Sequence, residues 1–283
     1  MVNGPKELIP LLDELGFVVE EELATVLYLQ LKLEKPLLLE GNPGVGKTQV
    51  AYLLSEYLGY DLIRLQCYEG LDVNNAIYEW NYQKQLLAIK IHEESSISAK
   101  EKEEMIFGRD YLLKRPLLQA ITSERKMVLL IDEIDRADEE FEAFLLELLS
   151  DFQISIPELG TIKAKHRPIV VLTSNRTREL SDALKRRCLY HWVNYPDMEK
   201  ELKIIRKHIP DIEMRLAEQI ADYVQKMRNL KLDKSPGIAE TLDWAKGIAA
   251  LGVQDDRAIY NSLSCLLKSD HDIQLVSQEL FEA

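Results

Sequence analysis

Residues 41–48 of the chain read GNPGVGKT and match the phosphate-binding pattern G-x-x-x-x-G-K-[ST]. The apolar run PLLLE precedes this motif at 36–40 and predicts a strand that is buried on both faces. After the motif, apolar residues recur at helical spacing from Val50 to Leu58, and Gly59 predicts the end of that helix. A strand, a glycine-rich turn and a helix in this order predict an α/β fold with a phosphate site.

The residue types of this loop each have a physical reason. Glycine permits backbone angles and a close approach that a Cβ atom would block, so that successive N–H groups point at phosphate oxygens. We expect Lys47 to reach the β- and γ-phosphates, and Thr48 to offer its hydroxyl to Mg²⁺. The predicted nucleotide contacts are Gly41, Asn42, Pro43, Gly44, Val45, Gly46, Lys47 and Thr48.

Strand-like runs alternate with helical stretches along much of the chain. DLIRLQC (61–67), KMVLLIDE (126–133) and RPIVVLTSN (167–175) read as strands, and 137–152 reads as an amphipathic helix. Residues 5–34 read as helical. The alternation predicts a parallel sheet with helices on both faces.

The character of the sequence changes after Pro196, because only amphipathic helices separated by short polar turns follow, from 197 to 281. We therefore predict two domains, an α/β nucleotide-binding domain at 1–196 and an α-helical lid domain at 197–283. Within the first domain, residues 153–166 alternate between apolar and polar and turn at ELG, which predicts a β-hairpin.

An acidic pair closes one of the predicted strands. Asp132 and Glu133 follow the apolar run VLLI, and ligands of open α/β sheets bind at the carboxyl ends of the strands. Asp132 can hold a metal ion, and Glu133 can orient or deprotonate an attacking water. The pair favours hydrolysis over phosphoryl transfer by a kinase.

Polar and basic residues follow the strand at 167–175. Asn175 stands at its tip, and Arg176, Arg178, Lys185, Arg186 and Arg187 follow within a chain whose net charge is -13. A polar side chain at this tip can hydrogen-bond the γ-phosphate or the water. The cations are either solvated surface charges or groups that meet an anion there.

The order of these features resembles that of the AAA+ ATPases. The chain has a phosphate loop, an acidic pair, Asn175 at a strand tip, a short helix that ends in arginines and then a helical domain. The resemblance implies ATP and Mg²⁺ as cofactors, a ring oligomer, a hexamer in most members, and the sensor-1 role for Asn175. It also implies that Arg186 or Arg187 is an arginine finger donated to the γ-phosphate of the neighbouring subunit. Arg187 directly precedes the residue that returns the chain to the sheet, which favours Arg187.

Longer motifs resemble the MoxR branch, and specifically the CoxD-type ATPases that mature carbon monoxide dehydrogenase and related molybdenum hydroxylases. These motifs are CYEGLDVNNAIYEWNY, DYLLKRPLLQAI, LLIDEIDRAD, TSNRTRELSDALKRRCLYHW and KSPGIAETLDW. The resemblance implies a chaperone that remodels a metalloenzyme client together with a von Willebrand factor A partner. It makes 69–92 the helix-2 insert and 153–166 the pre-sensor-1 hairpin.

The chain departs from most AAA+ proteins at the lid, where a sensor-2 arginine usually begins a helix. That helix is expected near Ser235, yet no arginine occurs from Asn229 to Asp256. Either Lys234 takes the place of this arginine, or the lid does not contact the γ-phosphate.

Composition limits the alternatives. The net charge of -13 disfavours a DNA-directed AAA+ motor. A monomeric kinase or GTPase is disfavoured by Glu133, by the paired arginines and by the lack of an N-K-x-D tetrapeptide.

Three widely spaced cysteines form no disulfide framework or metal pair. With no signal peptide and no apolar run of membrane length, we expect a cytoplasmic protein without a membrane span.

Overall fold

The computed structural model describes residues 2–92, 98–157, 159–252 and 256–281. The chain divides into two compact units that interleave along the sequence. The first unit comprises 1–24, 41–49 and 192–283, and the second comprises 25–40 and 50–191. The phosphate loop thus belongs to the first unit, and the acidic pair belongs to the second.

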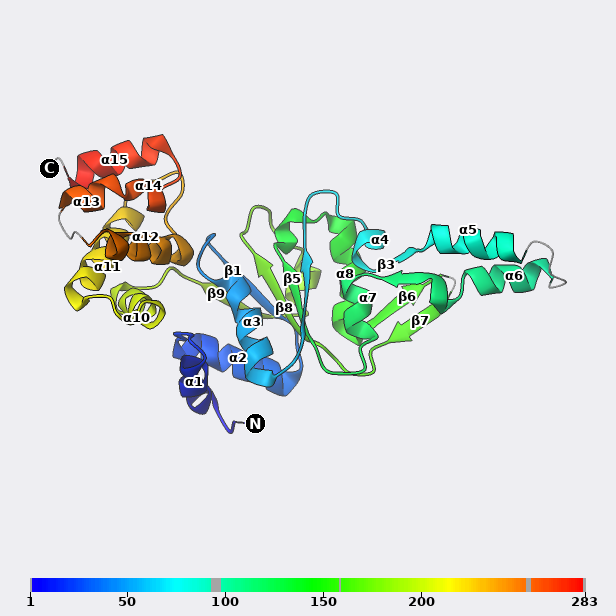
Figure 1. Cartoon of the computed structure of the whole chain (residues 1–283). Coiled ribbons are helices and arrows are strands. Elements are labelled where there is room, and N and C mark those ends of the chain that lie inside the picture. The colour runs from blue at the N-terminus through cyan, green and yellow to red at the C-terminus, as the bar shows by residue number, and fades with distance from the viewer. Residues whose placement is uncertain (1, 93–97, 158, 253–255, 282–283) are drawn as a thin grey trace. The chain divides into compact units, whose positions relative to one another are not determined.

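A five-stranded sheet in the order β2-β5-β8-β1-β9 forms the centre of the α/β fold. Its first four strands pair in parallel, as the apolar runs predict. The middle strands are buried at every position because helices cover parallel sheets. The strands are β1 (Leu37–Gly41), β2 (Leu62–Gln66), β5 (Val128–Asp132), β8 (Ile169–Ser174) and β9 (Leu189–Val193), of which β1, β5 and β8 are labelled side by side in Figure 1.

Helices complete the core of the second unit. Apolar side chains from these helices and from the sheet, among them Phe141, Leu145 and Leu148 of the predicted helix at 137–152, are almost fully buried. The helices that contribute to this core include α7 (Pro116–Ile121), η2 (Ile134–Arg136), α8 (Glu139–Asp151) and α9 (Asp182–Lys185). Two more helices, α2 (Glu21–Leu33) and α3 (Lys47–Leu58), belong to this unit for most of their length. The α/β architecture predicted from the sequence is confirmed.

The segment at 69–92, predicted to be the helix-2 insert, contains α4 (Val73–Ala76), β3 (Tyr78–Trp80) and α5 (Tyr82–Ile91). It continues through α6 (Ala99–Ile106) and η1 (Arg109–Tyr111) to β4 (Leu112–Lys114), which pairs antiparallel with β3. The β-hairpin expected at 153–166 is confirmed as β6 (Gln153–Ile156) and β7 (Gly160–Lys163).

The part of the first unit after 196 is helical, as predicted, and packs around the fully buried Trp244. Figure 1 shows these helices gathered together in yellow to red. They are α10 (Met198–His208), α11 (Met214–Arg228), α12 (Ile238–Leu251), α13 (Asp256–Asn261), α14 (Leu263–Leu266) and α15 (Asp270–Leu280). The domain boundary near 196 stays a prediction. Among the described residues, no helix is both long enough and apolar enough to cross a bilayer.

Residues 5–34, predicted to be helical, form two helices, α1 (Pro5–Glu14) and α2, with a break at 15–20 between them. Gly16 adopts a φ of +96° and donates its N–H to Asp13, while Phe17 donates to Leu12. These two bonds form a Schellman motif, which ends α1 because glycine takes the left-handed conformation without steric cost.

Candidate functional site

The phosphate loop joins β1 to α3, which begins at Lys47 as the motif requires. Gly44 and Gly46 have φ values of +78° and +89°, a region that residues with a Cβ avoid. A Cβ placed on Gly41 would lie 2.2 Å from the carbonyl oxygen of Val193. Glycine at these positions is therefore required by the backbone itself.

Lys47 is almost fully buried, at 6% exposure. Its ammonium donates to two carbonyl oxygens of the loop, that of Gly41 at 2.8 Å and that of Asn42 at 2.7 Å. Backbone carbonyls of the loop thus contact the ammonium group of Lys47, which lies at the N-terminus of α3. A phosphate at this helix end would meet both the lysine charge and the helix dipole.

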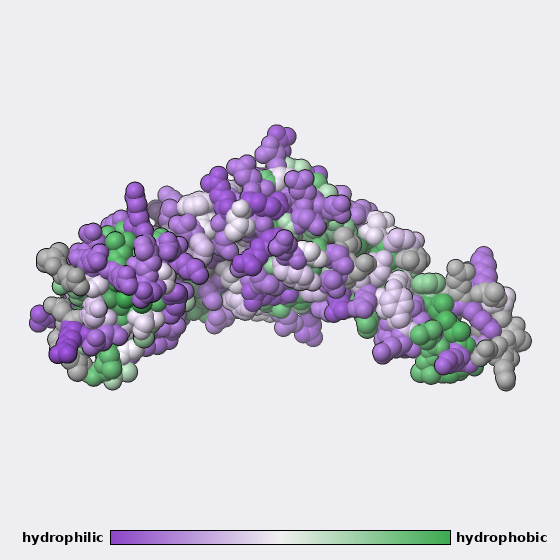
Figure 2. Space-filling model, turned by 90° about the horizontal axis from the view of Figure 1, so that it is seen from above, coloured by the Kyte–Doolittle hydropathy of each residue, from purple (hydrophilic) through white to green (hydrophobic). Residues whose placement is uncertain are grey.

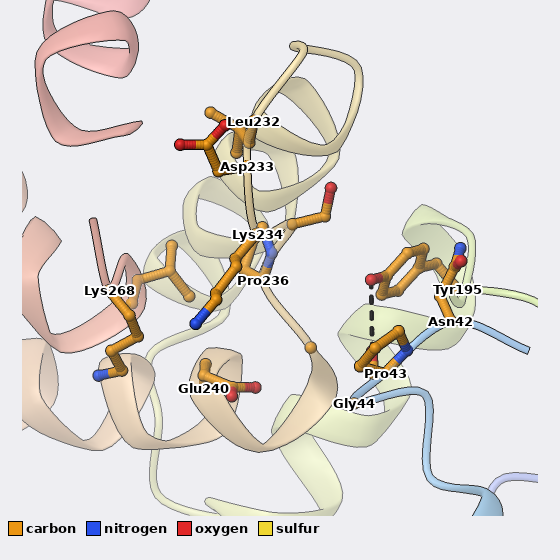
Figure 3. A pocket seen from close by; sticks show the side chains of 13 residues that line it. Asn42, Pro43, Gly44, Tyr195, Leu232, Asp233, Lys234, Pro236, Glu240 and Lys268 are labelled. Carbon is orange, nitrogen blue, oxygen red and sulfur yellow. Dashed lines mark hydrogen bonds between the residues drawn. The ribbon is translucent and has the colours of Figure 1, made fainter. Parts of the chain in front are cut away.

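Within the first unit, the loop contacts the start of α12 through the main chain. Ile238 donates its N–H to the Gly44 carbonyl at 2.8 Å, and a Cβ added to Gly237 would lie 2.7 Å from the Gly44 Cα. The hydroxyl of Tyr195 donates to the Pro43 carbonyl at 3.3 Å (Figure 3). Glycine at 237 therefore allows the start of α12 to approach the loop backbone, near the position where a sensor-2 residue is expected.

Arg228 supports this arrangement, although no sequence motif singles out this residue. The guanidinium forms an almost completely buried ion pair with Glu201 and donates from Nε to the Pro236 carbonyl at 3.0 Å. It also lies 4.7 Å from the centroid of the Tyr195 ring. One arginine thus holds both the tyrosine that contacts the loop and the turn that leads into α12.

A cavity of about 490 Å³ lies beside the loop in the first unit, lined by Asn42, Gly44 and the turn before α12. The side chains of Lys234, Glu240 and Lys268 surround it in Figure 3. The backbone N–H of Lys234 is held by the buried carboxylate of Asp272 at 3.2 Å. The lysine proposed as a substitute for sensor 2 therefore stands on a fixed backbone at the edge of this cavity.

In the second unit, the hydroxyl of Thr173 on the neighbouring strand β8 forms hydrogen bonds with both residues of the acidic pair. Thr173 donates its O–H to Asp132 Oδ1 at 2.5 Å and accepts the N–H of Glu133 at 2.9 Å. Glu133 adopts a left-handed conformation with φ of +54°, which costs on the order of 1–3 kcal/mol for a residue other than glycine. The strained backbone turns Glu133 out of the strand direction, while Asp132 stays 2% exposed.

Both carboxylates have an arginine counter-ion. Asp132 Oδ2 accepts from Arg64 of β2, at 3.0 Å from Nε and 2.5 Å from Nη2. Glu133 pairs with Arg136 Nε at 2.7 Å, and its side chain is 30% exposed. Neither arginine was identified from the sequence, because each reaches its partner from another strand or from the turn that follows.

Asn175 is positioned by a buried acid in the turn after the acidic pair. Asp135, at 3% exposure, accepts the N–H of Asn175 at 3.2 Å and the N–H of Thr177 at 2.8 Å. It also accepts the hydroxyl of Thr177 at 2.7 Å. This carboxylate fixes the backbone at the tip of β8, so the structure brings Asn175 to the same edge of the sheet as Asp132 and Glu133.

The arginines that follow β8 have different surroundings. Arg178 pairs with Glu142, which is 2% exposed, and donates to the Ala137 carbonyl, so its charge is used inside the fold. Arg187 donates to Ser150 Oγ at 2.5 Å and to the Ala183 carbonyl at 2.9 Å. Arg186 is exposed, and over the ranges that the structure describes its guanidinium has no hydrogen bond or ion pair.

The environment around Asp132 at the end of β5 is desolvated and negatively charged, as the buried thiol of Cys67 shows. Its N–H donates to the Asp132 carbonyl at 2.8 Å, and its side chain is 1% exposed. Burial, followed by the negative charge of Asp132, raises the pKa of the Cys67 thiol to about 12. A divalent cation would offset this negative field.

The residues present fit a magnesium nucleotide. Carboxylate and hydroxyl oxygens are the ligands that Mg²⁺ prefers, and each unit offers one of them, the hydroxyl of Thr48 in the first and the carboxylate of Asp132 in the second. The glycine positions leave no Cβ between the loop backbone and a phosphate. The sequence predictions thus fall into two groups. The loop residues lie together in the first unit, and Asp132, Glu133 and Asn175 lie together in the second.

The sheet places a phosphate loop after β1, a polar strand tip after the adjacent strand β8, and an acidic pair at the end of β5 on the other side of β8. These features define a P-loop ATPase of the AAA+ class. The family model for the AAA domain (dynein-related subfamily) matches residues 36–188. The chain belongs to this family and is an ATP-hydrolysing enzyme.

Similar proteins agree with this class. The gas vesicle ATPase GvpN of Haloferax mediterranei is 23% identical over 246 residues, which cover 82% of this chain and 67% of that protein. An uncharacterized protein of Staphylococcus aureus is 26% identical over 256 residues, which cover 86% of this chain and 89% of that protein. A mutant of RuvB from Thermotoga maritima superimposes with a TM-score of 0.55 at 19% identity, over 89% of this chain and 71% of that one, and shares the fold.

Proposed function

We propose that this ATPase is a MoxR-type AAA+ chaperone, which uses ATP hydrolysis to remodel a client protein. The single observation that carries the proposal is Arg186, an exposed arginine without a partner in the described chain, next to two arginines that the fold itself uses. An unpaired cation at the end of α9 suits an anion on another subunit. The MoxR-type motifs and the similarity to a gas vesicle ATPase support the same conclusion.

The roles of the site residues follow from their chemistry. Because the loop follows β1 and parallel strands end at one edge, the loop and the acidic pair are expected to face the same nucleotide. Lys47 would bind the phosphates, and Thr48 and Asp132 would hold Mg²⁺, which supplies charge neutralisation when bound. Glu133 would accept a proton from the attacking water, and Asn175 would orient that water or the γ-phosphate.

An exposed apolar surface on α5 supports a role in protein remodelling. Leu86, Leu87, Ile89 and Ile91 are 43–67% exposed on one short helix. Figure 2 shows a hydrophobic patch over this part of the molecule, and Figure 1 places α5 beside α6 and away from the sheet. Exposed patches of this kind mark protein–protein contacts. By contrast, Trp80 of the same segment packs edge-on against Phe107.

The finer assignment rests on the CoxD-type motifs. We infer a hexameric ring in the cytoplasm, a von Willebrand factor A partner and a metalloenzyme client such as a molybdenum hydroxylase. The lid domain at 197–283 would respond to the nucleotide bound by the domain at 1–196, with Lys234 in place of the sensor-2 arginine. A DNA-directed motor is the alternative.

Turnover per subunit is expected to rise with protein concentration and then saturate, in the presence of ATP and Mg²⁺ and without a partner. The reason is that each active site would be completed by an arginine from a neighbouring subunit. The measurement is phosphate release across a dilution series, with sizing at each concentration. A constant turnover at concentrations where only monomer is present would contradict the ring mechanism, and stimulation by DNA would favour the alternative.

Replacing Arg186 by alanine is expected to lower kcat by about 10³-fold, the lower end of the effect of an arginine finger. Arg187→Ala is the matched comparison, and we expect it to act mainly on stability, because its guanidinium holds Ser150 and Ala183. Mixing Arg186→Ala with Glu133→Gln subunits should restore activity at mixed interfaces. A larger loss of kcat in Arg187→Ala, with its unfolding temperature unchanged, would assign the finger to Arg187.

A further inference from the structure

Asp132 is enclosed by one residue from each neighbouring strand. In the strand order β2-β5-β8, Arg64 reaches it from β2 and Thr173 reaches it from β8. The two carboxylate oxygens are divided between them, since Oδ1 accepts the hydroxyl of Thr173 and Oδ2 accepts two N–H groups of Arg64. The oxygen that faces Arg64 therefore already has a cation.

The two partners of this ion pair differ sharply in exposure. The side chain of Arg64 is 44% exposed, whereas that of Asp132 is 3% exposed. The arginine can move into water at little cost, because its long side chain is flexible and remains hydrated. The carboxylate cannot, because a buried charge that loses its partner is strongly destabilised. Arg64 is thus the partner that can be exchanged, and only for another cation.

The register of the strands explains how Arg64 reaches this position. In the parallel pairing of β2 with β5, Arg64 lies opposite Leu130, and Gln66 lies opposite Asp132. Arg64 and Gln66 project on the same face of the sheet because side chains alternate along a strand. The guanidinium extends toward the carboxyl end of the strand, where it also donates to Gln66 Oε1. Gln66 could retain the arginine at the edge after it leaves Asp132.

We propose that Arg64 is a positioning residue that acts as an exchangeable counter-ion of Asp132. Without a nucleotide, it keeps the buried carboxylate oriented and paired. When a nucleotide binds together with Mg²⁺, Arg64 would release the carboxylate of Asp132, which would then be available to hold the metal, and the guanidinium would move toward solvent and Gln66. The arginine thereby competes with Mg²⁺, so it raises the Mg²⁺ concentration that nucleotide binding requires. This inference rests on the proposed binding of Mg²⁺ by Asp132.

The test is the Mg²⁺ dependence of nucleotide affinity in the full-length Arg64→Gln variant. A fluorescent ATP analogue is titrated at a series of free Mg²⁺ concentrations, and in EDTA. Arg64→Gln is expected to lower the half-saturating Mg²⁺ concentration about fivefold, which corresponds to about 1 kcal/mol. Its affinity in EDTA should change little, since the phosphate loop is untouched.

Arg115→Gln is the matched control. Arg115 is 43% exposed, much as Arg64 is, but it pairs with the partly exposed Glu79 of β3 in the same unit, so the variant removes an arginine of similar exposure that does not contact Asp132. Its Mg²⁺ requirement should equal that of the wild type. In an Asp132→Asn background, Arg64→Gln should have no further effect on the Mg²⁺ requirement, because the carboxylate through which it acts is gone.

Three results would overturn the inference: an unchanged or higher Mg²⁺ requirement in Arg64→Gln, an equal decrease in Arg115→Gln, or a decrease that persists in the Asp132→Asn background. A thermal melt adds an independent readout, since Mg²⁺ and the analogue together should stabilise Arg64→Gln more than the wild type. If the wild type binds no analogue at any Mg²⁺ concentration, the proposed function itself fails. Binding with an unaltered Mg²⁺ dependence rejects the role of Arg64 alone.

Discussion

Replacing Lys47 by alanine is expected to abolish nucleotide binding and to leave the fold intact. The ammonium is buried at the N-terminus of α3, where two loop carbonyls hold it 2.8 and 2.7 Å away. A phosphate would gain hydrogen bonds to this charge, and bonds of that kind contribute about 1.5–3 kcal/mol each. We therefore expect at least a 100-fold loss of affinity, or about 2.7 kcal/mol, in an equilibrium titration with a fluorescent ATP analogue.

Lys246→Ala is the control for this variant, because Lys246 lies exposed on α12 within the same unit as the loop. It should bind nucleotide as the wild type does. Far-ultraviolet circular dichroism and a thermal melt should show that Lys47→Ala is folded. Tight ATP binding by a folded Lys47→Ala protein would mean that the GNPGVGKT loop is not the phosphate site.

The central strands and the loop could be predicted because their signals are local. PLLLE, VLLI and IVVL are continuous apolar runs of strand length, and glycine spacing fixes the loop between a strand and a helix. The three-residue strands β3 and β4 gave no such signal. They are too short for an alternating pattern, and each depends on a partner far along the chain.

The acidic pair could be predicted, but its surroundings could not. Asp132 and Glu133 are adjacent in sequence, so their position after an apolar strand is visible. Arg64 is 68 residues away, and only the parallel register brings it to Asp132. The same holds for Arg228, whose role depends on Glu201 of another helix and on the turn before α12.

The basic cluster shows how packing separates residues that look alike in sequence. Arg178 and Arg186 are both arginines near a strand end, and the sequence alone offers each as a surface charge or a ligand. Arg178 forms an ion pair with the buried Glu142, because an acid at 2% exposure needs a counter-ion. Arg186 stands on the exposed end of α9. Arg187 is also held inside the fold, because it donates to Ser150 and to the Ala183 carbonyl. These environments, rather than spacing, support Arg186 over Arg187 as the residue offered to another subunit.

Replacing Glu133 by glutamine is expected to preserve ATP binding and to lower kcat by about 10²–10⁴-fold, the usual contribution of a general base. Glutamine has the same shape but its amide cannot accept the proton of the attacking water. The N–H of residue 133 would still donate to Thr173, so the backbone of the acidic pair should be retained. Single-turnover phosphate release measures the loss, and sizing should show that ATP holds the variant in its oligomeric form.

Glu140→Gln provides the matched control, because Glu140 is an exposed acid in the first turn of α8 and its substitution by glutamine removes the same charge. Its turnover should equal that of the wild type. If Glu133→Gln also keeps the wild-type turnover, Glu133 has no part in the chemistry, and its strained backbone needs a different explanation. If Glu133→Gln loses ATP binding as well, the carboxylate acts on the bound metal or nucleotide rather than on water. Only intact binding with lost hydrolysis identifies Glu133 as the base.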